Sequence, residues 1–247
     1  MSDLSQSLVA AIAKALNSNQ IPCILWGHFL LNVHGVPSII DSIDFVIPDE
    51  DLWAGTRALT HVKDLTPCPD SEACLTSSEE RYTPPPAFHV HIEDSECTVG
   101  LYLQSQTLWF LPPLDSSLLS QNKIELPSHF VLASDKAILP AWRPGRGSGV
   151  FQSERDGVVV VPRSHVLLEA FMRLYVRNSG KRIGSFSMAM IDYMELYVDE
   201  DGLLDVNQLP EPLRTFYNEL KQGTKPVRQW TKELKEPQGI FEDLEDD

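Results

Sequence analysis

The stretch from Ile21 to Ile47, IPCILWGHFLLNVHGVPSIIDSIDFVI, decides the fold. An apolar run ends at Gly27, and a short apolar segment follows. The turn Gly35-Val36-Pro37 then precedes a second apolar run, Ile39 to Ile47. Because Gly27 precedes the middle segment and Gly35-Val36-Pro37 follows it, the pattern predicts strand, turn, short helix, turn and strand.

The second apolar run carries acids only at Asp41 and Asp44. In a strand, Asp44 points away from the face that Ile43 and Phe45 present to the core. An unpaired carboxylate is costly to bury, so we expect Asp44 to point into a wet cleft. Asp41 and Asp44 are three residues apart, so they face opposite sides of a regular strand, and only a bulge would bring them together.

The order of these residues resembles the nucleotidyltransferase fold, in particular its minimal bacterial and uncharacterised short fungal members. That family reads hydrophobic-Gly-Gly, a short helix, Gly-x-Pro, and a strand that bears Asp-x-Asp. The likeness runs without a gap from Leu25 to Ile47, with Gly27 as the first glycine. His28 stands where the family has Gly or Ser, and Ser42 stands where it has the first metal-binding Asp.

The resemblance also implies a third carboxylate on a later strand. The corresponding stretch is Val99-Gly100-Leu101, with glycine in the place of the acid. Nucleotidyl transfer normally needs two divalent ions clamped by carboxylates. Asp44 is the one retained metal ligand, and a single carboxylate holds Mg²⁺ poorly. The sequence therefore predicts a degenerate metal site, and it leaves open whether the protein is a transferase or a pseudoenzyme.

Composition bounds the class of protein. The chain has 247 residues, of which 43% are hydrophobic, enough for one large domain or two modest ones. It has no apolar run of about 18 residues, which argues against a membrane span, and its N-terminus lacks the features of a signal peptide. The four cysteines show no CxxC spacing, which favours plain buried or surface residues over metal ligands. Cys23 lies in the predicted core strand, which argues for reduced thiols in a cytoplasmic protein.

The charge is unevenly distributed. The net charge of −15 argues against tight, non-specific binding to nucleic acid. Residues 135–182 nevertheless hold 9 bases against 4 acids. Such a basic island attracts phosphates or carboxylates, or it is a solvated helix face. Within it, the loop AWRPGRGSG at 141–149 lacks the Lys-Ser/Thr pair of a P-loop, so we interpret it as an exposed hinge.

The remaining pattern predicts an α/β (α+β) protein with a small mixed sheet, helices on one side and a helical C-terminal portion. We expect a nucleotidyltransferase-like core at 1–134, the helical portion at 135–235 and an acidic, disordered tail at 236–247. The predicted elements are a helix at 52–62, a mobile loop at 66–86, a β-hairpin formed by 88–92 and 97–103, and helices at 165–177, 186–197 and 213–220. The succession of helices resembles the helical tail of the same family, so the likeness extends over about 21–198.

The candidate site follows from this fold analogy and from charge. Asp44 is the candidate catalytic residue and metal ligand, and His28 is either a general base or a hydrogen-bonded histidine. The candidate substrate-binding residues are Gly27, Ser42, Arg163, Arg173, Arg177 and Lys181.

Three functions are compatible with these observations. The first is binding of a nucleotide or another phosphate-bearing ligand without metal chemistry. The second is another transfer reaction of fungal secondary metabolism. One candidate is a tRNA-dependent cyclodipeptide synthase, but the Asp-Asp-x-x-Glu signature of those enzymes is not matched by Asp49-Glu50-Asp51, and the net charge disfavours tRNA. The third is a non-catalytic partner whose acidic surface docks a basic protein.

Overall fold

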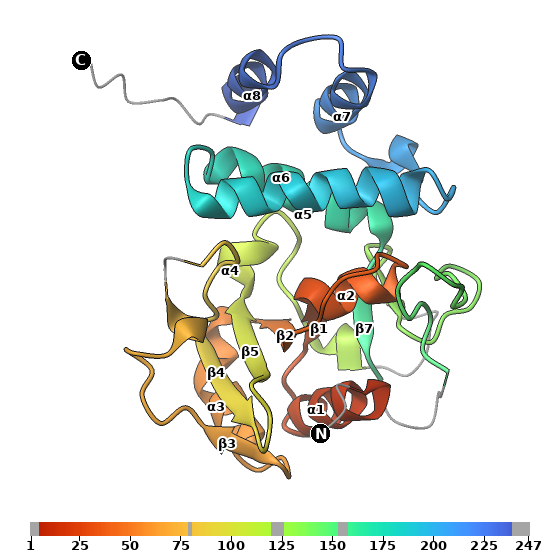
Figure 1. Cartoon of the computed structure of the whole chain (residues 1–247). Coiled ribbons are helices and arrows are strands. Elements are labelled where there is room, and N and C mark those ends of the chain that lie inside the picture. Colours follow the sequence, from red (N-terminus) through yellow and green to blue (C-terminus); the bar gives the residue numbers. More distant parts are fainter. Residues whose placement is uncertain (1–4, 79–80, 120–125, 153–157, 239–247) are drawn as a thin grey trace. The chain divides into compact units, whose positions relative to one another are not determined.

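The structure is a computed structural model that describes residues 5–78, 81–119, 126–152 and 158–238. The chain is mixed α/β and forms two compact units, residues 1–163 and 164–247. The order of the elements along the chain can be followed in Figure 1. The fold class predicted from the sequence is therefore confirmed, whereas the division between units lies after residue 163 and not after residue 134.

A mixed sheet forms the centre of the first unit, and its described strands follow the order β1-β2-β5-β4-β3. Strands β2 and β5 are parallel, and the other neighbouring pairs are antiparallel. Helix α2 connects β1 to β2, so the predicted succession of strand, helix and strand is confirmed, as is the hairpin of β4 and β5. The bounds are β1 (Ile24–Trp26), α2 (Gly27–Val33), β2 (Ser42–Ile47), β3 (Leu65–Pro67), β4 (Phe88–Ile92) and β5 (Thr98–Leu103).

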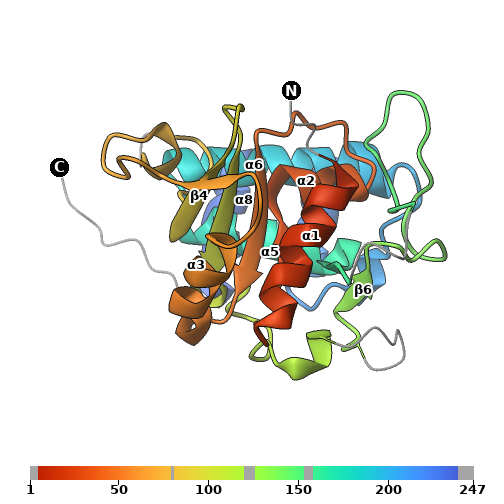
Figure 2. The same ribbon diagram turned by 90° about the horizontal axis from the view of Figure 1, so that it is seen from below.

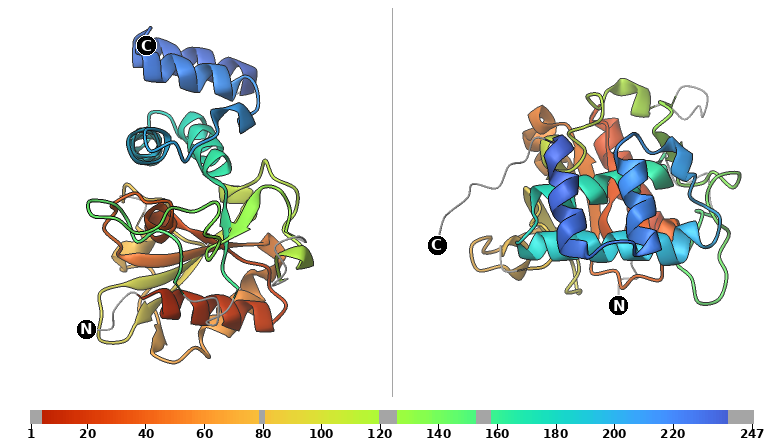
Figure 3. Two further views of the ribbon diagram at one scale, coloured as in Figure 1. Left: turned by 90° about the vertical axis from the view of Figure 1, so that its right-hand side faces the viewer. Right: turned by 90° about the horizontal axis from the view of Figure 1, so that it is seen from above.

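Two helices, α1 (Gln6–Ser18) and α3 (Leu52–Leu59), cover one face of this sheet (Figure 2). Gly55 of α3 is so close to the sheet that an added Cβ would meet the side chains of Leu101 and Ile47. Helix α2 lies on the opposite face (Figure 3, left). The prediction that helices lie on one side is therefore correct for α1 and α3 and wrong for α2.

The segment after residue 134 belongs to the first unit because it forms long-range pairs there. Strand β6 (Phe130–Leu132) pairs in antiparallel fashion with β7 (Val160–Pro162). The Phe151 N–H donates to the Ala133 carbonyl at 2.8 Å, and the Asn17 amide of α1 donates to the Val158 carbonyl at 3.2 Å. Such pairs cannot be read from local patterns, which explains why the predicted boundary was too early.

The segment at 66–86, predicted as a mobile loop, begins within β3 and contains a 3₁₀ turn at Leu75–Ser77. Its far end is attached to the sheet, because the Tyr102 hydroxyl donates to the Pro84 carbonyl at 2.9 Å. Before it enters β4, the segment crosses the sheet face that carries Asp44. Pro86 lies there next to Gly100, the neighbour of Asp44 in the sheet. Residues 79–80 lie outside the described part. After β5 the chain forms a short helix, α4 (Gln104–Thr107).

The second unit is helical in its described part, as predicted. Its helices are α5 (Ser164–Arg177), α6 (Arg182–Met194), which ends in a π turn at Glu195–Asp199, α7 (Leu213–Gln222) and α8 (Val227–Lys235). Helices α7 and α8 run side by side (Figure 3, right), where the indole N–H of the buried Trp230 donates to the Phe216 carbonyl at 2.7 Å. Helix α8 was not predicted. The expected disordered tail lies, from residue 239 onward, outside the described residues.

No helix in the described part of the chain is both long and apolar enough to cross a membrane.

Candidate functional site

Asp44 lies at the middle of β2, on the sheet face opposite α3. The alternation of β2 directs Ile43, Phe45 and Ile47 toward the helices and directs Ser42 and Asp44 the other way. In the register of the sheet, Asp44 is paired with Trp26 of β1 on one side and with Gly100 of β5 on the other. The face predicted for Asp44 from strand alternation is therefore the one observed.

Two glycines make room for the Asp44 carboxylate. Gly27 has a φ of +67°, and a Cβ atom there would lie 2.5 Å from Asp44 Oδ2. A Cβ atom at Gly100 would lie 2.5 Å from Oδ1 of the same carboxylate. Separations this short are repulsive, so the carboxylate occupies the space that side chains at both positions would need. Gly100, which the resemblance places at the position of a third acid, is thus the direct neighbour of Asp44 in the sheet.

Asp44 is buried, with 5% of its surface exposed. The prediction that it points into a wet cleft is therefore wrong. Ser42 Oγ donates a hydrogen bond of 2.6 Å to Asp44 Oδ2, and the Gly100 backbone contributes another. Burial nevertheless dominates, because a carboxylate loses its hydration there, and it raises the pKa of Asp44 to about 7. The carboxyl group therefore changes charge near neutral pH.

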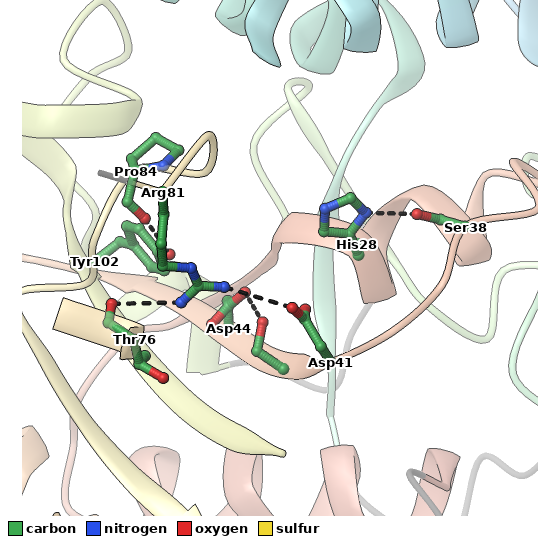
Figure 4. Close-up of polar contacts among 9 residues, drawn as sticks. His28, Ser38, Asp41, Asp44, Thr76, Arg81, Pro84 and Tyr102 are labelled. Atoms are coloured by element: carbon green, nitrogen blue, oxygen red, sulfur yellow. Dashed lines mark hydrogen bonds and ion pairs between the residues drawn. The ribbon is translucent and has the colours of Figure 1, made fainter. Parts of the chain in front are cut away.

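Arg81 is the positive group of this site, and sequence reasoning did not identify it. Its guanidinium forms an ion pair of 3.4 Å with Asp41 Oδ2 and donates to the Thr76 carbonyl at 3.4 Å. Figure 4 shows the guanidinium extending over the strand toward Asp41 and Asp44. Its charge lowers the pKa of Asp44, in opposition to the larger effect of burial. Arg81 is thus a cation that faces Asp41 and Asp44.

The residues around Asp44 do not fit a magnesium site. Among the described residues, no group of three metal-ligating side chains includes Asp44. The neighbours of Asp44 on this face, Ser42 and Gly100, carry no carboxylate, and the exposed Asp41 is paired with Arg81. Octahedral coordination of Mg²⁺ requires several oxygen ligands, which one buried carboxyl group does not provide. We therefore derive no metal-dependent step at this site.

His28 lies in the first turn of α2, and its Nδ1 shares a hydrogen bond with Ser38 Oγ (Figure 4). Burial lowers the pKa of His28, while the neighbouring Asp41 raises it. The lower pKa favours a neutral imidazole at pH 7, which is the form that a general base requires. The bond to Ser38 also matches the alternative of a plain hydrogen-bonded histidine.

The Gly/Arg/Pro segment is not an exposed hinge along its whole length. Residues 141–145 are exposed, but Gly147 and Gly149 are buried against α2. The Gly147 N–H donates to the Gly35 carbonyl at 2.8 Å, and the Gly149 N–H donates to the Asn32 carbonyl at 3.0 Å. Because these amides already have protein partners, this segment does not offer them to a phosphate.

The predicted basic residues are divided between the two units. Arg163 ends the first unit, directly after β7, and its backbone N–H donates to the His129 carbonyl. Arg173 and Arg177 lie on α5, where Arg173 forms an ion pair of 2.8 Å with Glu169 one helical turn away. Lys181 directly precedes α6. The cation that pairs with Asp41 is therefore Arg81, which was not among the predicted basic residues. The ion pair with Glu169 compensates the charge of Arg173.

A pocket of about 870 Å³ lies within the second unit, between the end of α5 and α8. It is lined by Tyr175, Ser179, Gly180, Pro226, Val227, Arg228, Gln229, Thr231, Lys232 and Lys235. The basic residues of this pocket belong to α8, the helix that the sequence did not predict. The residues expected to hold substrate, Arg173, Arg177 and Lys181, are not in its lining.

Comparison with known proteins gives no relative for this chain: no family model, no curated protein and no solved structure matches it.

Proposed function

We propose that the first unit is a nucleotidyltransferase-like scaffold that binds a nucleotide or another phosphate-bearing ligand without divalent metal ions. The observation that carries this proposal is the pairing of Asp44 with Gly100 in neighbouring parallel strands. The helix that begins at Gly27, the acid Asp44 on the next strand and the neighbouring position Gly100 follow one another in the order of the family pattern. Two of the three acid positions hold Ser42 and Gly100, which supply no carboxylate to clamp magnesium.

Arg81 supplies the positive charge that metal ions supply in the family that the sequence resembles. Its pair with Asp41 is partly solvent-exposed, with exposed side-chain fractions of 25% and 59%. Exposed ion pairs of this kind contribute little to stability, so the guanidinium can exchange Asp41 for a phosphate at small cost. A guanidinium binds phosphate oxygens through two parallel hydrogen bonds, which suits it to a metal-free site.

The first test is calorimetric titration of the full chain with each nucleoside triphosphate, with and without magnesium. We expect binding of at least one of them, with the same affinity in both buffers. In Arg81→Gln the affinity should fall about tenfold or more, because hydrogen bonds to charged groups contribute about 1.5–3 kcal/mol. The matched control is Arg57→Gln, which removes an exposed arginine of α3 on the other face of the sheet.

Two results would contradict the proposal. Magnesium-dependent release of pyrophosphate from a nucleoside triphosphate would show that two-metal chemistry is retained. Equal affinities for wild type, Arg81→Gln and Arg57→Gln would show that Arg81 does not contact the ligand.

A further inference from the structure

Four metal-ligating side chains meet on the edge of the sheet formed by β3 and β4. They are Cys68, Cys74, His89 and His91, and their ligand atoms all lie within 4.8 Å of one another. Among the histidine, cysteine and acidic side chains that the structure describes, these four are the ones that lie close enough together to hold a metal ion. All four positions lie outside the Asp44 site.

The sheet register explains how distant residues meet. Pro67 of β3 is paired with Val90 of β4, and the strands are antiparallel, so the next residue, Cys68, arrives beside His89. His89 and His91 are two residues apart in β4 and therefore share one face of the strand. Cys74 joins them from the start of the 3₁₀ turn at 75–77.

The chemistry and the spacing of the four ligands fit zinc. Two thiolates and two imidazoles form a common structural zinc set, with Zn–S bonds of about 2.3 Å and Zn–N bonds of about 2.0–2.1 Å. In a tetrahedron these bonds place neighbouring ligand atoms roughly 3.3–3.8 Å apart. Cys74 Sγ and His91 Nε2 are 3.7 Å apart, and both cysteines are free thiols. Four protein ligands leave no open position, which is typical of a structural and not a catalytic site.

An independent observation comes from His89. Its side chain is buried, with 4% of the residue exposed, and its Nε2 has no hydrogen-bond partner among the described residues. A buried polar atom without a hydrogen-bond partner is costly, and a bound metal ion is one of the standard reasons for such an atom. A metal ion bound by Nε2 would remove this cost.

We propose that Cys68, Cys74, His89 and His91 bind one Zn²⁺ ion, which fastens the segment after β3 to the sheet. Binding releases the thiol protons to solvent as both cysteines coordinate as thiolates. The fastened segment continues to Arg81, so the ion restricts the path of the chain that delivers the guanidinium to Asp41. The metal site itself does not depend on the phosphate ligand proposed above.

The experiment uses the full chain, purified under reducing conditions with zinc present. Elemental analysis should give about one zinc ion per chain, and replacement by cobalt(II) should give the visible absorption of a tetrahedral site with thiolate ligands. Zinc should be lost in Cys68→Ser and in His91→Asn. It should remain in two matched controls outside the group, Cys97→Ser and His61→Asn.

Hydrogen exchange adds a readout that does not need a variant. Removing zinc with a chelator should accelerate amide exchange in residues 68–78 and leave exchange in α1 unchanged. The proposal is overturned if the wild-type chain neither retains zinc nor gives the tetrahedral cobalt spectrum. It is also overturned if the Cys97→Ser and His61→Asn controls lose the metal to the same extent as the ligand variants, since the ion would then be held elsewhere.

Discussion

The substitution Asp44→Asn is expected to stabilise the protein relative to wild type by an amount that grows as the pH rises from about 4 to about 7. The pKa of Asp44 is about 7 in the folded state, whereas an aspartate in an unfolded chain has a pKa of about 3.9. Between these two values the folded state binds a proton that the unfolded state has released. Stability therefore falls with rising pH across this window, and the loss remains constant above it.

The expected size follows from the separation of the two pKa values. Each unit corresponds to about 1.4 kcal/mol, so ionisation of buried Asp44 costs on the order of 4 kcal/mol at pH 8. Asparagine has no charge to bury and keeps an oxygen that can accept the hydrogen bond of Ser42. The difference in unfolding free energy between the variant and wild type should thus be several kcal/mol larger at pH 8 than at pH 4.

Urea unfolding at a series of pH values measures this difference directly. Asp94→Asn is the matched control, because Asp94 is exposed in the turn between β4 and β5 and involves no comparable burial. If wild type and Asp44→Asn follow parallel pH profiles, the carboxyl group is not buried as the structure shows.

The second prediction concerns Gly27→Ala, which is expected to destabilise the first unit by about 2–5 kcal/mol. Two costs add. A left-handed backbone costs a non-glycine residue roughly 1–2 kcal/mol, and forcing a methyl group into a filled space costs about 1–3 kcal/mol. The methyl group would lie 2.5 Å from Asp44 Oδ2, in a carboxyl group whose position is also limited by Gly100 and Ser42.

Gly145→Ala separates the two costs. Gly145 has a similar φ of +75°, but a Cβ atom there meets nothing within 4 Å. This control therefore carries the backbone cost alone. The destabilisation by Gly27→Ala in excess of that by Gly145→Ala is the cost of the contact with Asp44. Adding Asp44→Ala to Gly27→Ala should restore this part of the stability, and a double-mutant cycle measures it as a coupling energy. Equal destabilisation by Gly27→Ala and Gly145→Ala would mean that Asp44 does not press against this turn.

The parts of the fold that could be predicted are those determined by residues close together in the sequence. Glycine and proline mark the turns around α2, and strand alternation gives the correct face for Asp44. The burial of Asp44 could not be predicted, because it depends on a segment about 40 residues later that returns across this face with Arg81 and Pro86. The resemblance to nucleotidyltransferases remains a prediction.

Other features were missed because the spacing of their residues along the sequence gives little indication of them. Cys68 and Cys74 are separated by five residues and His89 and His91 by one, and the two pairs become a single group only through the register of β3 and β4. Helix α8 buries just Trp230 and Leu234 among polar residues, so its apolar stripe is too narrow to stand out.

The close fit of Asp44 between two glycines limits how this protein could be altered. Placing a carboxylate at position 100 would not by itself create a magnesium-binding centre, because the Cβ atom would meet Asp44 Oδ1 at 2.5 Å and the Pro86 Cβ at 3.2 Å. The irregular segment around Pro86, which crosses this face, would have to be displaced first. Any engineering toward metal-dependent catalysis must therefore begin with the segment around Pro86 and only then add acidic residues.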